Sequence, residues 1–270
     1  MSLKQSFLSA FRVMNFIIAE RAWRTLVVEA DFKVQKELPK ANVLIVAPHP
    51  DDEIFGCAGA LVSILKEQKV QIAYIFSGDQ KSKSKHADER EEESKEAVRL
   101  LTNPEQIFFR QPDNSVATKQ TISELSSIIQ ELDSGIIFLP SFSDPNIDHR
   151  ESVRASIEAL KIAQIKGTKI KRIFVWLYEI WSPLPYFNRL LEFDWKEKEK
   201  AMEQFKTQQK ERNYVKAIKS LNEYRGEIYG LGKPAEAFFA IPVDLLVKLY
   251  AKNNLFSDEY PNRQHDGGGD

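Results

Sequence analysis

The chain has 270 residues, and its 38 basic and 39 acidic side chains nearly cancel. This balance excludes a strong overall field for nucleic acid, and the length allows one large or two modest domains. The single cysteine, Cys57, excludes an intramolecular disulfide framework and fits a reducing compartment. We therefore predict a cytoplasmic protein that does not bind nucleic acid.

Residues 1–38 are rich in apolar side chains, but charged ones interrupt them. Arg12, Glu20 and Arg24 rule out a charge-free transmembrane span, and no small-residue cleavage site of a secretory signal follows. The apolar positions recur at helical spacing, as in Phe7, Phe11, Met14 and Ile18. We predict an amphipathic helical extension that packs on the domain, on a second subunit or peripherally at the inner face of a membrane.

Between residues 39 and 255, short apolar runs alternate with segments of helical periodicity. The first helical segment, for example, has Ile54, Ala58 and Leu61 on one face. This alternation predicts one α/β domain with a Rossmann-like, mostly parallel sheet and helices on both faces. The predicted strands are 43–47, 70–76, 106–109, 136–139 and 173–178.

The C-terminal third differs in composition. From Trp195 to Leu221 it is rich in Lys, Glu and Gln, which predicts a long solvent-facing helix. Residues 235–239 and 243–250 are predicted to return to the domain as a short strand and a helix. Residues 256–270 include three consecutive glycines and have nothing to pack, so we predict a disordered tail.

The most informative feature is the sequence His-Pro-Asp-Asp-Glu at 49–53, directly after the apolar run 43–47. Charges at the end of a buried strand are costly unless something offsets their desolvation, and a divalent cation commonly does so. In open parallel sheets, sites form outside the carboxyl ends of the strands. A second such loop, after 136–139, contains Asp148 and His149. Both loops are therefore expected to place a metal site at this edge of the sheet.

His49, Asp52 and His149 make a two-histidine, one-carboxylate set of the kind that holds catalytic zinc and leaves a position open for water. Asp51 can stand beside that water as general base, because a turn entering a helix sends neighbouring side chains in different directions. Such a centre suits hydrolysis of an amide or ester. A plain helix cap, with Asp51 or Asp52 at the N-cap and Glu53 in the first turn, is the simpler interpretation. A cap does not explain the second Asp-His pair.

These residues resemble a known family, the PIG-L/LmbE-like zinc-dependent N-deacetylases, whose members remove acetyl groups from N-acetylglucosamine units. Residues 46–53, followed by Gly56 and Gly59, are similar to its signature segment. The resemblance covers roughly residues 40–240 and is most specific at the signature. Its further elements are the helix motif Arg90, Glu93 and Ala97, the acid Asp113 and the second metal motif Asp148-His149-Arg150.

The resemblance implies zinc as the cofactor, with other divalent ions as alternatives, and a small-molecule or lipid-linked amino sugar as the substrate. It implies that Arg90 and Asp113 hold sugar hydroxyls or a phosphate-like group. It also implies the ligands His49, Asp52 and His149 and the base Asp51, which agrees with the spacing argument.

One position departs from the family pattern. The second motif usually reads His-x-Asp-His, and Asn146 occupies its first position. An asparagine amide can donate a hydrogen bond to an oxyanion but cannot shuttle a proton, so Asp51 would act first as base and then as acid. Two alternatives stay open. One is a zinc- and sugar-binding homologue with little or no turnover; the other is a magnesium-dependent phosphohydrolase, although hard octahedral ions rarely take two imidazoles.

Overall fold

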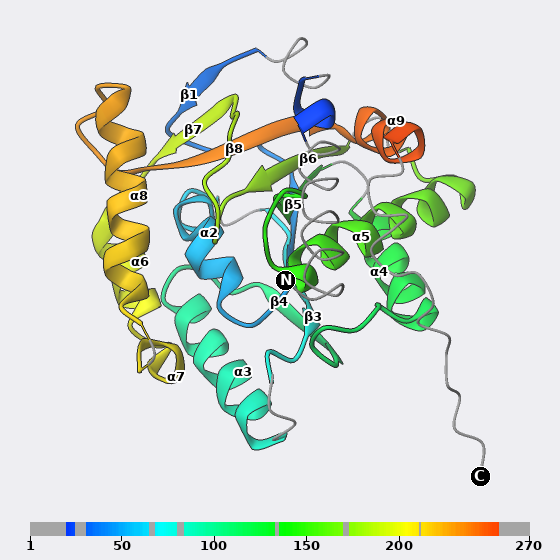
Figure 1. Cartoon of the computed structure of the whole chain (residues 1–270), viewed down its shortest axis with the longest axis horizontal. Helices are drawn as coiled ribbons and strands as arrows, with labels where there is room; N and C mark the ends of the chain where they lie inside the picture. Colours follow the sequence, from blue (N-terminus) through cyan, green and yellow to red (C-terminus); the bar gives the residue numbers. More distant parts are fainter. Residues whose placement is uncertain are drawn as a thin grey trace, which may run out of the picture.

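The computed structural model describes residues 20–24, 31–64, 68–79, 84–132, 135–169, 173–210 and 212–253. Within this part of the chain, eight strands form one sheet in the order β1-β7-β8-β6-β5-β2-β3-β4 (Figure 1). The strands are β1 (Lys33–Gln35), β2 (Asn42–Ala47), β3 (Val70–Phe76), β4 (Glu105–Gln111), β5 (Gly135–Pro140), β6 (Ile173–Tyr178), β7 (Arg189–Glu192) and β8 (Ala235–Pro242). The helices are α2 (Asp52–Val62), α3 (Ser84–Arg99), α4 (Lys119–Glu131), α5 (Ile147–Ile165), α6 (Trp195–Met202), α7 (Lys206–Gln209), α8 (Tyr214–Ile228) and α9 (Val243–Asn253).

The sheet is parallel except for β8, which runs antiparallel to both of its neighbours, β6 and β7. β2 and β5 are neighbours inside the sheet, with Val43 beside Ile136. From β2 the chain moves outward through β3 and β4, and from β5 it moves the other way to β6. The strand order therefore reverses between β2 and β5, and in such sheets this switch point is where ligands bind.

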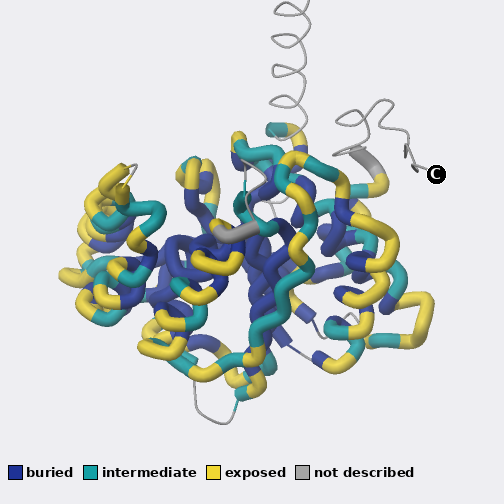
Figure 2. Tube along the Cα trace, turned by 90° about the horizontal axis from the view of Figure 1, so that it is seen from below, coloured by how far each residue is buried: buried dark blue, intermediate teal, exposed yellow. Residues whose placement is uncertain are grey.

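Helices cover both faces of the sheet, because successive strand residues point to opposite sides. Leu44 and Val46 of β2 pack in a core with α4, α5 and α9. Val43, Ile45 and Ala47 pack in a second core with α2, α3, α6 and α8. Buried segments run through the middle of the molecule and exposed ones lie outside (Figure 2). These two layers confirm the predicted fold class.

All five predicted strands are present, and 235–239 and 243–250 correspond to β8 and α9. Two strands were not predicted: β7, and β1, which pairs with β7 and lies within residues 1–38. The prediction missed them because both are short, and β1 is mostly exposed. Residues 1–19, 25–30 and 254–270 lie outside the described residues, so the helical extension, the tail and the domain limits stay predictions. In the described part of the chain, no helix has the length and apolar character needed to cross a membrane.

The prediction of one long solvent-facing helix over 195–221 is wrong. The segment forms α6, α7 and the start of α8, and it turns inward between them. Phe205, between α6 and α7, is fully buried, and its ring lies 5.7 Å from that of Phe55 in α2. Asn213 then caps α8, its side chain accepting a hydrogen bond from the Lys216 backbone N–H. Burial of one aromatic side chain and a new helix cap break the helix that composition suggested.

Candidate active site

The three predicted ligands meet at the switch point. His49 follows β2, Asp52 is the first residue of α2, and His149 lies in the first turn of α5, which follows β5. Asp52 Oδ2 is 3.3 Å from His49 Nδ1 and 3.3 Å from His149 Nε2. The three side chains are buried, and their candidate ligand atoms lie within 4.8 Å of one another. One cation can therefore contact all three.

Each imidazole also has a carboxylate behind it, on the side away from Asp52. His49 Nε2 is 3.0 Å from Asp148 Oδ2, and His149 Nδ1 is 3.4 Å from Asp144 Oδ2. A carboxylate in this position orients a ligating histidine and makes it more basic. This supporting role of Asp144 and Asp148 was not predicted from the sequence. Their positions in the loop could have indicated it, because both acids precede His149, Asp144 by five residues and Asp148 by one.

Buried atoms that make no hydrogen bond indicate that the donor set fits a cation. Asp52 Oδ1 and both ring nitrogens of His149 are buried and make no hydrogen bond with any described residue. Buried polar atoms are rarely left without a partner, and a metal ion would supply one. A second group, His49 with Asp113 and Asp148, also converges, but there His49 Nε2 is already hydrogen-bonded to Asp148. The His49–Asp52–His149 group is therefore the better cation site.

The acids around the histidines strongly favour positive charge at this point. Burial alone would lower the pKa of His49, but its hydrogen bonds to Asp148 and Asp52 raise it to about 9. The same competition, with Asp52 and Asp144 opposing burial, raises the pKa of His149 to about 10. Burial would raise the pKa of Asp52, yet the adjacent histidines hold it well below its usual range. A divalent cation can replace the protons that these side chains otherwise keep.

Asp51, the predicted base, has a strained backbone. Its φ of 148° is unusual for a residue with a side chain, and such conformations cost on the order of 1–3 kcal/mol. Its N–H donates to Glu53 Oε2 at 2.9 Å, and Glu53 Oε1 accepts from Ser94 of α3 at 2.7 Å. Glu53 thus holds the turn in place. Burial raises the pKa of Asp51 to about 6, although Arg90 opposes the shift.

Arg90 contacts the predicted base directly. Its Nη2 group donates to Asp51 Oδ2 at 2.8 Å and to the Pro50 carbonyl at 3.1 Å, and Nη1 donates to the Gly78 carbonyl at 2.6 Å. Gly78 has a φ of +71°, and a Cβ there would lie 2.2 Å from Arg90 Nη1. The absence of a side chain at Gly78 therefore lets the guanidinium reach Asp51. Both Nη groups of Arg90 already bind the protein, and its buried Nε makes no hydrogen bond with the described residues, whereas the resemblance assigns Arg90 to substrate.

Asp113 and Asn146 line the same cavity. Asp113 Oδ1 accepts from the Gly78 N–H at 2.8 Å, while its buried Oδ2 has no hydrogen bond with the described residues. Asn146 is the N-cap of α5, and its Oδ1 accepts from the Asp148 N–H at 2.9 Å. Because Oδ1 serves the cap, only the Nδ2 group of Asn146 is left to donate to a ligand. The Oδ2 atom of Asp113 is likewise left to accept a hydrogen bond from a ligand.

The cavity has a volume of about 710 Å³ and is lined mainly by polar residues. We define the strand-end cluster as His49, Asp51, Asp52 and His149; the first three line the cavity, and His149 is fully buried. Another part of the lining comes from the C-terminal third, which we call the C-terminal rim and define as Trp181, Thr207, Gln208, Arg212 and Tyr214.

Comparison with known families supports this interpretation of the strand-end cluster. Residues 44–160 match the family described as PIG-L: GlcNAc-PI de-N-acetylase. The matched segment is therefore similar to this family. It includes every residue of the strand-end cluster, together with Arg90, Asp113 and Asn146. The C-terminal rim of the cavity lies beyond the matched residues.

Solved structures share the fold of this chain. A conserved protein of Thermus thermophilus has a TM-score of 0.64 at 24% identity, over 75% of this chain and 95% of its own. The N,N'-diacetylchitobiose deacetylase of Pyrococcus horikoshii also has a TM-score of 0.64, at 19% identity over 91% and 95% of the two chains. The 4-carboxy-2-hydroxymuconate hydratase of Pseudomonas putida has a TM-score of 0.61 at 19% identity, over 74% and 96%. The fold thus occurs in enzymes of different reaction classes.

Proposed function

We propose that this protein is a zinc-dependent hydrolase that removes an acetyl group from the amine of an N-acetylated amino sugar or its conjugate. The PIG-L match over 44–160 and the convergence of His49, Asp52 and His149 support the proposal. The shared fold does not determine the reaction, because the solved structures with this fold include both a deacetylase and a hydratase. The single observation that carries the proposal is the buried ligand set with unpaired donor atoms.

A zinc ion held by His49, Asp52 and His149 would supply Lewis acidity, which polarises an acetamide carbonyl and acidifies water. The protein's own side chains carry out the other steps. Asp51 takes the proton of the attacking water, and its pKa of about 6 keeps it ionised at neutral pH while leaving it a useful base. With a cation held by the neighbouring ligands, the pKa of Asp51 would fall further.

Asp51 stays in position because Arg90 and the backbone contact to Glu53 fix its side chain and its turn. As the carbonyl oxygen gains negative charge, Asn146 Nδ2 donates a hydrogen bond to it. Asp51 then returns its proton to the departing amine nitrogen, since Asn146 cannot do so. Acetate and a free amino sugar leave. Asp113 Oδ2 is left to accept from a sugar hydroxyl.

The substrate is a soluble or lipid-linked amino sugar, and the protein acts in the cytoplasm or at the inner face of a membrane. The membrane contact would come from the N-terminal helical extension, which lies mostly outside the described residues. Both assignments follow from the resemblance in sequence rather than from the shape of the cavity.

Acetate release tests the proposal. Zinc-loaded protein is incubated with N-acetylglucosamine, N,N'-diacetylchitobiose and N-acetylglucosamine 1-phosphate, with His49→Ala as the matched variant. We expect acetate from at least one sugar with the intact chain and none with His49→Ala. Phosphate release from a phosphate ester with magnesium would favour the phosphohydrolase instead. Sugar binding without acetate release would favour a binding homologue, and Asn146→His would then be expected to start turnover.

A further inference from the structure

The C-terminal rim contains a cation, Arg212, whose charge is not paired with any residue that the structure describes. Arg212 lies just before α8, is exposed, and lines the cavity. Among the described residues, its guanidinium forms no hydrogen bond or ion pair. The other basic side chains among the described lining residues differ: Arg90 is held by Asp51, and His86 Nδ1 lies 3.5 Å from Glu89 Oε2. Among the described residues that line the cavity, Arg212 is therefore the cation left to bind a ligand.

The rim that presents Arg212 is held in place from two sides. Glu93 of α3 accepts from the Thr207 N–H at 2.9 Å and from the Thr207 hydroxyl at 2.5 Å, which ties α7 to α3. In Figure 1, α7 lies beside α3 below α8. On the other side, the Tyr214 ring lies 5.3 Å from Trp181 and 5.6 Å from Phe55 of α2. The wall is thus preorganised around its cation.

Charge is arranged unevenly in the cavity. The acids Asp51, Asp52 and Asp113 lie at the strand ends, where Arg90 pairs with Asp51 and a cation held by Asp52 and the two histidines would add further positive charge. The rim contributes Arg212 together with the rings of Trp181 and Tyr214 and the polar Thr207 and Gln208. The acetamide must reach the strand-end cluster, so the rim faces another part of the substrate. The cavity volume of about 710 Å³ is within the range of sites for drug-sized ligands, so it has room for more than the acetamide group.

We propose that the C-terminal rim binds an acidic group on the substrate, a phosphate or a carboxylate attached to the sugar away from its acetamide, and that Arg212 is the residue that selects for it. This inference rests on the proposed function for the placement of the acetamide. A guanidinium pairs with either oxyanion through two parallel N–H donors, and such charge-assisted hydrogen bonds are stronger than neutral ones. Trp181 and Tyr214 would then cover the sugar ring between the two ends.

Binding measurements test the rim without depending on turnover. The protein is loaded with zinc in an Asp51→Asn background, and calorimetry gives dissociation constants for three sugars. They are methyl N-acetylglucosaminide, which is neutral, N-acetylglucosamine 1-phosphate, and the carboxymethyl glycoside of N-acetylglucosamine. We expect at least one acidic sugar to bind about tenfold more tightly than the neutral one, and the two acidic sugars together show whether phosphate or carboxylate is preferred.

Arg212→Gln should remove that advantage while changing the affinity for the methyl glycoside by less than about twofold, and Arg212→Lys should keep part of it. Lys210→Gln is the matched control, because Lys210 lies two residues away and lines a separate groove between α3 and α7. It should keep the full advantage. Equal affinities for the three sugars, an advantage that survives Arg212→Gln, or no binding of any sugar would each overturn the inference.

The same sugars separate this inference from the proposed function. If the chain with Asp51 intact releases no acetate but the acidic sugar still binds through Arg212, the deacetylase proposal fails and the rim assignment stands. If acetate is released equally well from neutral and acidic sugars, and Arg212→Gln changes neither rate, the deacetylase proposal stands and the rim assignment fails.

Discussion

The strand-end cluster and the C-terminal rim meet at one cavity, but they are built in different ways. The cluster comes from two loops that follow adjacent parallel strands, β2 and β5, so local sequence places its side chains. The rim comes from α7 and the start of α8, and long-range contacts such as Glu93 to Thr207 hold it. We infer that the cluster determines the chemistry and the rim determines which substrate reaches it. Changes in the two regions should therefore have separable effects.

The largest effect on turnover is expected from Asp51→Asn, which removes the base and keeps the shape of the side chain. Loss of a general base costs roughly 10²- to 10⁴-fold in rate. We expect kcat to fall by that amount while zinc content, measured by atomic emission on the purified protein, stays the same. An unchanged kcat would show that the cluster uses another base. Glu92→Gln, at an exposed acid of α3, is a control that should leave kcat unchanged.

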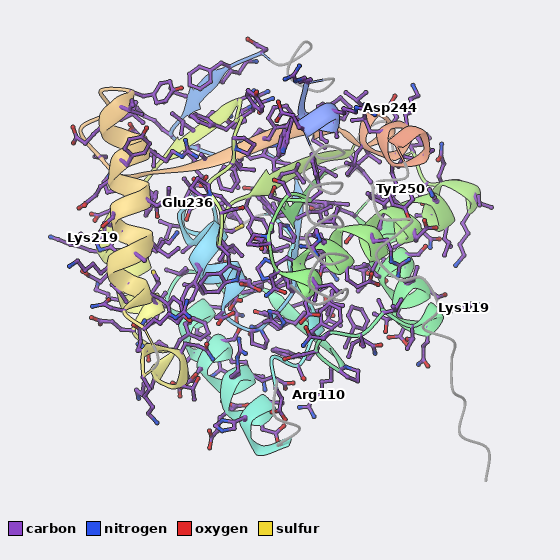
Figure 3. The ribbon with its side chains drawn as sticks, in the orientation of Figure 1. Arg110, Lys119, Lys219, Glu236, Asp244 and Tyr250 are labelled. Carbon is purple, nitrogen blue, oxygen red and sulfur yellow. The ribbon has the colours of Figure 1, made fainter. Side chains whose placement is uncertain are left out.

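Lys198→Met tests whether the C-terminal third stabilises the fold around the cluster. Lys198 is fully buried; its Nζ donates to Glu236 at 2.7 Å and to the Phe55 carbonyl at 2.8 Å. Glu236 in turn accepts hydrogen bonds from the Gly59 and Ala60 N–H groups of α2. Figure 3 shows Glu236 beside this helix. Removing the Lys198 ammonium leaves the buried Glu236 carboxylate without its cation, and such a change typically lowers the free energy of unfolding by about 3–5 kcal/mol.

For Lys198→Met, we expect the free energy of unfolding in urea to fall by that amount, while the zinc affinity of the folded protein is unchanged. The exposed Lys196→Met should change the free energy of unfolding by less than about 0.5 kcal/mol. A loss of less than about 1 kcal/mol for Lys198→Met would contradict the role of this ion pair in holding α2.

Asp148→Asn should weaken the cluster without dismantling it. The carboxylate of Asp148 is 3.0 Å from His49 Nε2, and removing its charge should loosen the orientation of the imidazole and make it less basic. Substitutions of this kind cost about 10- to 100-fold in metal affinity. A zinc competition titration with a coloured chelator measures the change. An affinity within twofold of the original would show that Asp148 does not support His49, and Arg212→Gln in the rim should leave zinc affinity unchanged.

A smaller effect is expected from pH on zinc binding. The pKa values of His49 and His149, about 9 and 10 without a cation, keep both imidazoles protonated at pH 7. Zinc binds only the neutral rings, so binding should release about two protons, and affinity should rise with pH up to about 10, the pKa of His149. Calorimetry at pH 7 in two buffers of different ionisation enthalpy gives the number of protons. No proton release would contradict the assignment of the two histidines as ligands.

The cluster could be predicted from sequence because its signals are local. The apolar run 43–47 and the acids at 51–53 are adjacent in the chain, and parallel strands bring their carboxyl ends to one edge. What local sequence did not show is the contact of Arg90 with Asp51, which depends on Gly78 after β3. Residues from three separate segments make that contact, and no single motif contains them.

The rim could not be predicted because its fold is decided by distant partners. The polar composition of 195–221 favours a solvent-facing helix, yet Phe205 is buried against α2 and Lys198 against Glu236. Phe205 and its partner Phe55 are far apart in the sequence, and Lys198 and Glu236 are 38 positions apart. Helical periodicity reports the face of one helix and does not report where the chain turns inward to bury a single side chain.

X-ray absorption spectroscopy of the zinc-loaded protein tests the central claim most directly. We predict a zinc ion bound by two imidazole nitrogens and by carboxylate or water oxygens in the intact chain, and by one imidazole nitrogen fewer in His149→Ala. A spectrum that shows one imidazole or none in the intact chain, or that is unchanged by His149→Ala, would contradict the convergence of the two loops on one cation.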